Sequence, residues 1–134
     1  MSPGGQVLVP NITFIASATA VILAGLDVVL VDIDPSTACM NKNSLRKAIT
    51  KKTKVIMPVH LYGISCEMDE IMHISNKYGI PVIEDNAECF TSTYKGQSTG
   101  TIGHMASYSF ENSKHMSCGE GGMLITNHEH LAKL

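Results

Sequence analysis

Short apolar runs alternate with longer stretches of helical spacing along this chain of 134 residues. Runs of about four to eight consecutive apolar residues predict buried strands. These runs lie at 6–9, 28–31, 54–58, 81–84, 106–110 and 122–126. Helices are predicted between them over 13–24, 44–49 and 67–78, and a last helix begins near Asn127. Gly25 and Gly79 follow two of these helices, as is typical of helix C-termini.

Strands that alternate with helices predict an α/β fold. The expected architecture has three layers, α/β/α, around a largely parallel sheet. The run at 28–31 has no polar residue, which predicts a strand covered on both faces. In such sheets ligands bind beyond the carboxyl ends of the strands. Attention therefore falls on Asp85, at the end of one strand, and on the segment after Phe110.

The stretch before Asp27 carries no charged side chain, and we expect it to form buried interior. Its continuous part, 12–26, is shorter than the roughly 20 residues of a membrane-spanning helix. No basic segment precedes it, which argues against a secretory signal.

Composition and charge narrow the class of protein. Hydrophobic residues make up 44% of the chain and charged residues 16%, which favours one packed domain over disorder. Lys and Arg total 10 against 12 Asp and Glu, so we expect neither a nucleic-acid site nor a basic membrane patch. The 4 cysteines form no CxxC pair, so reduced thiols in a cytoplasmic protein are expected rather than disulfides or a zinc knuckle.

Two residues carry the candidate chemistry. Asp85, at a strand end, could be a helix cap, a metal ligand or the partner of a cationic heterocycle. Lys114 lies in a loop rich in Ser and Gly, although most lysines are simply solvated surface charges. Together they suit pyridoxal phosphate, for which a lysine forms the Schiff base and an aspartate keeps the pyridine nitrogen protonated. Gly121-Gly122 would then allow close approach of backbone to a ligand.

The histidines and the glycine cluster have simpler interpretations. His60 is either a packed, hydrogen-bonded side chain or a catalytic one, and the sequence leaves both open. His128 and His130 are expected on the surface, because they have no acidic or cysteine partner at ligand spacing. The cluster at 119–122 precedes a strand and not a helix, which argues against an ordinary nucleotide-binding domain.

Five motifs, in order, resemble those of the DegT/DnrJ/EryC1/StrS aminotransferases. They are VPNITF (9–14), VDIDP (31–35), PVHLYG (58–63), IEDNAE (83–88) and the segment 109–122. The resemblance implies the large domain of a fold-type-I enzyme that depends on pyridoxal 5′-phosphate. Members mostly transfer an amino group, usually from glutamate, to a nucleotide-linked keto-sugar, and relatives act on cyclitols or make aminohydroxybenzoate.

The resemblance also implies roles for individual residues. Lys114 matches the Schiff-base lysine and Asp85 the pyridinium partner, so these two are the expected catalytic residues. Ser109 matches a phosphate-binding hydroxyl, and Phe14 matches the aromatic residue that stacks on the cofactor ring. Glu88 stands where the family commonly has Gln or His near the cofactor's 3′ oxygen. A carboxylate there repels a phenolate unless one of them is protonated.

The resemblance covers well under half of a typical member. Residues 1–134 therefore correspond to the central part of the cofactor-binding domain, without the preceding segment that carries a phosphate-binding turn and without the C-terminal small domain. The implied protein is a homodimer. The alternative is a catalytically silent fragment that acts only as a folded or partner-binding module.

Overall fold

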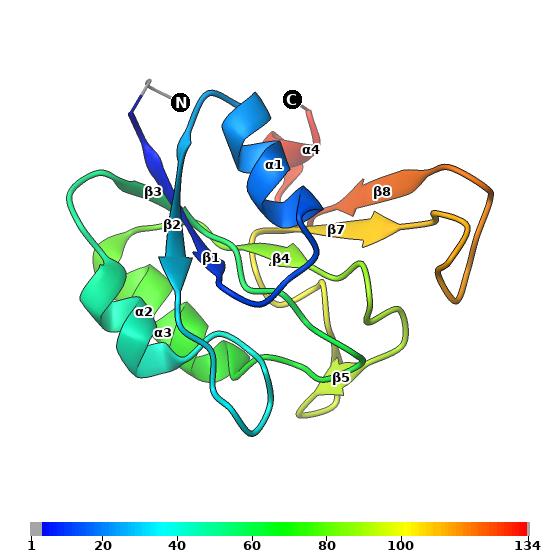
Figure 1. Ribbon diagram of the computed structural model, residues 1–134, viewed down its shortest axis with the longest axis horizontal. Helices are drawn as coiled ribbons and strands as arrows, with labels where there is room; N and C mark the ends of the chain where they lie inside the picture. Colours follow the sequence, from blue (N-terminus) through cyan, green and yellow to red (C-terminus); the bar gives the residue numbers. More distant parts are fainter. Residues whose placement is uncertain (1–3, 134) are drawn as a thin grey trace.

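The strands extend across the molecule as a mostly parallel sheet. The computed structural model describes residues 4–133 (Figure 1). Its strands are β1 (Gln6–Pro10), β2 (Asp27–Val31), β3 (Thr53–Ile56), β4 (Ile83–Asp85), β5 (Thr93–Tyr94), β6 (Gln97–Ser98), β7 (Met105–Ser109) and β8 (Gly122–Ile125). Pairing gives the orders β2-β1-β3 and β4-β7-β8. Parallel bridges from Ile56 to Val82 and from Val59 to Asp85 connect these two parts. Strand β8 is antiparallel to β7, and β5 and β6 form a separate hairpin.

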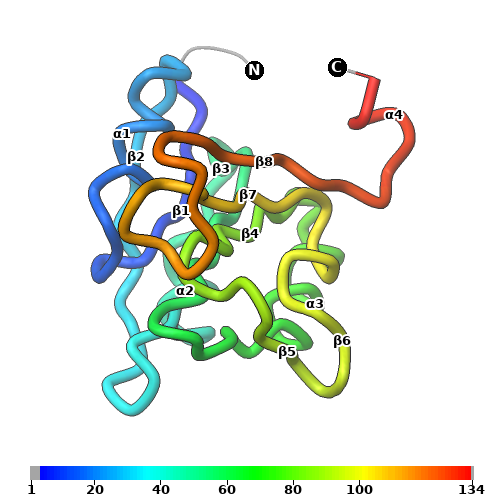
Figure 2. Tube along the Cα trace, turned by 90° about the vertical axis from the view of Figure 1, so that its right-hand side faces the viewer, coloured from blue at the N-terminus to red at the C-terminus, as the bar shows by residue number. Residues whose placement is uncertain are grey.

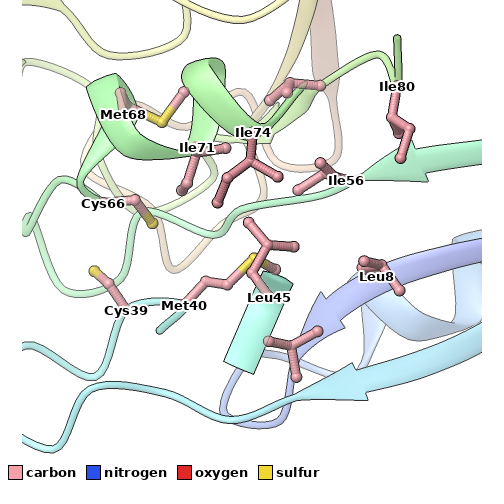
Figure 3. Packing of buried hydrophobic residues seen from close by; sticks show 12 residues of the cluster. Leu8, Cys39, Met40, Leu45, Ile56, Cys66, Met68, Ile71, Ile74 and Ile80 are labelled. Atoms are coloured by element: carbon pink, nitrogen blue, oxygen red, sulfur yellow. The ribbon is translucent and has the colours of Figure 1, made fainter. Parts of the chain in front are cut away.

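Helices cover both faces of the sheet. They are α1 (Ala16–Leu23), α2 (Lys42–Ala48), α3 (Met68–Tyr78) and the short α4 (Glu129–Ala132). Consecutive residues of β1 point to opposite faces, as in any strand. Val7 and Val9 pack with Val21 of α1. Leu8 instead joins the cluster around Leu45 of α2 and the apolar side of α3 (Figure 3). This arrangement confirms the predicted three-layer α/β/α fold.

Helix α3 shows how the sequence defines an element. Met68, Ile71 and Ile74 recur at helical spacing, and all three are buried against the sheet. Asp69 and Glu70 lie in the first turn, where negative charge is favourable to the helix dipole. Gly79 ends the helix in the left-handed conformation, with φ 64°. The predicted bounds, 67–78, therefore differ from the observed ones by one residue.

Helix α1 is shorter than the predicted 13–24. The backbone N–H of Asn11 still donates to the carbonyl of Val31, so the chain leaves the sheet only after this residue. Residues 12–15 are then needed for the turn into the helix. Smaller differences affect α2, which begins at Lys42 behind the capping side chain of Asn41, and β3, which ends at Ile56 where the chain changes partner from β1 to β4.

Two predictions of burial hold only in part. Strand β2 lies at the edge of the described sheet; its three valines are buried or half-buried, but Leu30 is 63% exposed. The uncharged stretch before Asp27 is buried along β1 but exposed on the outer side of α1, where Leu23 is 87% exposed. An apolar run indicates that a surface is suited to burial, but the neighbouring elements decide whether it is covered.

The carboxyl ends of β1, β4 and β7 meet at one edge of the sheet, because these strands run parallel. The arrows of β4 and β7 point toward this edge in Figure 1. Figure 2 is viewed from this side, with the segment between β7 and β8 in orange. Among the helices that the structure describes, none is long and apolar enough to cross a membrane.

Candidate active site

A cavity of about 480 Å³ opens at the carboxyl ends of these strands. Residues from the β1–α1 connection, from the ends of β4 and β7 and from the following loop line it. The cavity contains all five residues that the sequence singled out: Phe14, Asp85, Glu88, Ser109 and Lys114. Segments up to a hundred residues apart in the chain thus contribute to one site, as expected for the strand ends of an α/β sheet.

Asp85 is fixed by side chains of the β1–α1 region. Ser17 Oγ donates to Asp85 Oδ2 at 2.7 Å, and Ser17 itself exchanges a hydrogen bond of 2.8 Å with Thr13 Oγ1. The other oxygen, Oδ1, accepts from the backbone N–H of Ala87 at 3.2 Å. Asp85 is therefore no helix cap; its carboxylate is half-buried and held from two sides at the cavity wall.

Ser17 and Thr13 were not predicted as site residues. Ser17 is almost fully buried, and its hydroxyl has a carboxylate partner 68 positions away in the chain. The available signal was a pair of hydroxyl residues four positions apart next to Phe14, which lies in one of the quoted motifs. That spacing places two side chains on one face of a helical turn.

Lys114 lies near the carboxylate of Glu88. Lys114 Nζ is 3.7 Å from Glu88 Oε1, and the two side chains are only 20% and 28% exposed. Glu88 Oε2 also accepts from the backbone N–H of Tyr62 at 3.2 Å. Glu88 is thus held on one side by backbone and attracts the lysine amine on the other.

Phe14 and Ser109 lie on other parts of the cavity wall. The ring of Phe14 is 68% exposed and borders the cavity from the connection between β1 and α1. Ser109 ends β7, and its Oγ accepts a long hydrogen bond of 3.4 Å from the N–H of Glu111. Two hydrogen bonds from Ser113 lower the pKa of Glu111, and the bond from the Ser113 hydroxyl has a larger effect than the bond from its backbone N–H.

The glycines after Lys114 serve the packing of their own loop. A Cβ on Gly121 would lie 2.5 Å from Cys118 Sγ, and one on Gly122 would lie 3.1 Å from the carbonyl oxygen of Tyr108. Phe110 N–H donates to Gly121 O at 2.8 Å and closes the loop. Neither Gly121 nor Gly122 lines the cavity.

A second cavity, of about 360 Å³, adjoins the first. The two share Glu88, Ser113 and Lys114, and the second is also lined by Tyr62, Gly63 and His115. Lys114 therefore lies between a cavity that holds Asp85 and a more open one at the surface. No cluster of three or more His, Cys, Asp or Glu side chains suited to a metal ion occurs within residues 4–133.

Comparison with known proteins identifies the family. Residues 1–134 match the DegT/DnrJ/EryC1/StrS aminotransferase family over their whole length. This chain belongs to that family. The match confirms the family that the five motifs indicated, and with it the fold-type-I class of its relatives.

Individual relatives named as aminotransferases or sugar synthases are similar to nearly the whole of this chain. GDP-perosamine synthase of Caulobacter vibrioides is 46% identical over 132 residues, which are 98% of this chain and 36% of that protein. The UDP-2-acetamido-2-deoxy-3-oxo-D-glucuronate aminotransferase of Pseudomonas aeruginosa is 44% identical and is covered to 37%, with 98% of this chain matched. The structure of NtdA from Bacillus subtilis, with bound cofactor PMP, superposes with a TM-score of 0.90 at 36% identity, covering 99% of this chain and 30% of that chain. The DegT-family chain thus spans about a third of these relatives.

Proposed function

We propose that this chain is the cofactor-binding part of a pyridoxal 5′-phosphate-dependent aminotransferase. Its reaction is the transfer of an amino group, from glutamate, to a nucleotide-linked keto-sugar. One observation carries the proposal: Asp85 and Lys114 line the same cavity, at strand ends of a chain that belongs to an aminotransferase family.

The residues of the cavity fit this cofactor. A volume of about 480 Å³ is in the range of small-molecule sites. Apolar side chains of Met57, Val59 and Leu61 line it and suit the faces of a planar ring. Carboxylate, amine and hydroxyl groups are placed around this apolar lining, as pyridoxal phosphate requires for its ring nitrogen, aldehyde and phosphate.

When bound, pyridoxal phosphate supplies an electron sink for the carbon from which a proton is removed. Asp85 would hold the pyridine nitrogen in its protonated form, because an adjacent carboxylate favours the positive charge. Ser17 donates to this carboxylate and so keeps it correctly oriented. Phe14 would stack on the ring, and Ser109 would donate its hydroxyl to the phosphate.

Lys114 would hold the cofactor covalently through Nζ. Once displaced by the donor amine, the same Nζ would act as general base at the donor α-carbon and later as general acid. Glu88 lies within reach of this amine. We propose that Glu88 orients Lys114 beside the cofactor. The charge partner of the Glu88 carboxylate is then the lysine amine, and the carboxylate does not lie against the phenolate oxygen of the cofactor.

The substrate class rests on the relatives. The Caulobacter relative is named for a product carried on GDP, and the Pseudomonas relative for a UDP-linked keto-sugar. A homodimer with glutamate as amino donor follows from the family resemblance. Free cysteines at all four positions fit a cytoplasmic protein.

Borohydride reduction tests the proposal directly. The full-length protein is incubated with pyridoxal phosphate, reduced and digested, and we expect the pyridoxyl label on the peptide with Lys114. Lys95→Ala is the matched control, because Lys95 lies in the exposed β5–β6 turn and pairs with Asp69. It should leave labelling unchanged, whereas Lys114→Ala should abolish it. A label on another lysine, or none on the native protein, would contradict the proposal, and the second result would favour the silent module.

A further inference from the structure

Glu84 and His60 form a buried pair that the proposed reaction does not use. Both side chains are 0% exposed, and His60 Nε2 lies 2.8 Å from Glu84 Oε2. Neither residue lines the cavity. Because successive side chains of a strand point to opposite faces, Glu84 lies on the face of β4 opposite Asp85.

The Glu84 carboxylate accepts hydrogen bonds from three backbone N–H groups of one turn. Gly100 N–H donates to Oε2 at 2.7 Å, Ile102 N–H donates to Oε1 at 2.8 Å, and Gly103 N–H also donates to Oε1. This turn, 99–103, leads directly into β7, the strand that ends at Ser109. Glu84 therefore joins β4 to the start of β7.

The glycines of this turn fit closely around the carboxylate. A Cβ on Gly103 would lie 3.2 Å from Glu84 Cγ and 3.1 Å from Val82 Cγ1. Gly100 has φ +84°, a conformation that other residues rarely adopt. The turn can thus bring its N–H groups to Glu84 only because these positions carry no side chain.

His60 joins the same carboxylate to a third segment. Cys66 N–H donates to His60 Nδ1 at 3.1 Å, so Nδ1 carries no proton and Nε2–H donates to Glu84. The backbone N–H of His60 also donates to the carbonyl of Asp85 at 3.0 Å. His60 is therefore the packed, hydrogen-bonded histidine of the two interpretations that the sequence left open.

Glu84 is ionised in this environment. Burial by itself raises the pKa of the Glu84 carboxyl group. Hydrogen bonds from His60, Gly103 and Gly100 lower this pKa by more than burial raises it. The net effect is a pKa below the ordinary value for glutamate. Four donors on a buried charge make a network that is costly to disturb.

We propose that Glu84 is a positioning residue of the candidate active site, which fixes the end of β4, and with it Asp85, against His60 and the 99–103 turn. The proposal deepens the proposed function and rests on it only for the cofactor. With Glu84 held on one face, Asp85 is presented on the other at hydrogen-bonding distance from Ser17. Loss of this anchor lets the strand end rotate and moves Asp85 relative to Ser17 and Ala87.

Glu84→Gln tests this in the full-length protein, with two readouts. In the cofactor-free protein, the Ala87 amide donates to Asp85 Oδ1, so its hydrogen exchange reports the position of Asp85. We expect exchange at Ala87 to be roughly 10- to 100-fold faster in the variant. With pyridoxal phosphate added, we expect the affinity of the variant for this cofactor to be about tenfold lower than that of the native protein. We also expect a shift in the midpoint of the pH titration of the cofactor's visible absorption.

Ser75→Ala is the matched control. Ser75 lies buried in α3, does not line the cavity, and loses one hydrogen bond in the variant, from Oγ to the carbonyl of Ile80 at 2.6 Å. It should lower the melting temperature without changing Ala87 exchange or the absorption titration. Glu84→Asp keeps the negative charge, so its absorption titration should lie closer to that of the native protein than the titration of Glu84→Gln does.

Each outcome decides the question. If Glu84→Gln behaves like Ser75→Ala, Glu84 is only structural and the positioning role is wrong. If Glu84→Gln does not fold, His60→Gln, which leaves the three backbone donors in place, decides by the same readouts in the same direction. Native protein that fails to bind pyridoxal phosphate overturns the proposed function, while faster Ala87 exchange in the variant would still support the positioning of Asp85.

Discussion

The hydroxyl of Ser17 donates to the carboxylate of Asp85 across 2.7 Å, from helix α1 to the end of β4. Ser17 is only 4% exposed, so its hydroxyl has little access to water. Thr13 holds the Ser17 hydroxyl in turn. The carboxylate proposed to face the cofactor nitrogen is thereby fixed from behind by a short chain of hydroxyl groups.

Ser17→Ala should lower kcat of the full-length enzyme roughly 10- to 100-fold, because a hydrogen bond to a charged group contributes about 1.5–3 kcal/mol. Ser17→Thr keeps the hydroxyl and serves as the control; it should retain most of the activity. Steady-state kinetics of both variants measure the effect. Equal activity of Ser17→Ala and the native enzyme would show that Asp85 needs no support from α1.

Asp85→Asn should reduce turnover more than cofactor retention. The amide no longer favours a protonated ring nitrogen, and this loss affects the transition state more than the bound ground state. We expect kcat to fall at least about 100-fold while the Kd for pyridoxal phosphate changes less than about tenfold. Kinetics combined with equilibrium dialysis separate the two quantities. A variant with native turnover would remove Asp85 from the site.

Glu88→Gln tests the contact between Glu88 and Lys114. The pair is partly exposed and 3.7 Å apart, so its contribution is small, on the order of 0.5 kcal/mol. We expect labelling of Lys114 by pyridoxal phosphate and borohydride to be about twofold slower in the variant, because the amine is no longer oriented, and to depend less on salt. Labelling rates at low and high ionic strength measure this. A large loss of labelling would instead mean that the carboxylate holds the cofactor itself.

The isolated chain of 134 residues should self-associate and bind pyridoxal phosphate weakly. The outer side of α1 exposes Ile15, Ile22 and Leu23, and large apolar patches rarely remain in solvent. A net charge of −2 gives little repulsion against association. Light scattering measures the average mass of the native chain and of the Leu23→Lys variant in solution. We expect the variant to associate less. A native chain that is monomeric and binds the cofactor tightly would contradict both expectations.

Stability at acid pH should depend on Glu84. Its pKa in the folded protein is below the unfolded value of about 4.3, so the unfolded state binds more protons in this range. The contribution of Glu84 is therefore complete above about pH 4.3 and is lost as the pH falls through its folded pKa. Urea unfolding between about pH 3 and 6 should show this loss in the native protein, and a flatter dependence in Glu84→Gln. Parallel curves would mean that Glu84 is protonated in the fold.

The sequence by itself determined most of the elements and which five residues were candidates for the site. Strands and helices follow from local spacing, as in α3, where Met68, Ile71 and Ile74 share one face and Gly79 ends the helix. Asp85 could be selected because parallel strands present their carboxyl ends to ligands, and Lys114 because its motif resembles a known family. Both kinds of information are local in the chain.

The tertiary structure decided which side chains meet and which surfaces are covered. Ser17 reaches Asp85 across 68 positions, and Glu84 binds a turn that begins 15 residues after it, contacts that no local pattern encodes. The run at 28–31 and the outer side of α1 are apolar, yet they lie at an edge and on an open face of the described chain. Burial depends on the neighbours that an element acquires on folding, and hydrogen bonds between distant residues depend on how the strands are ordered in the sheet.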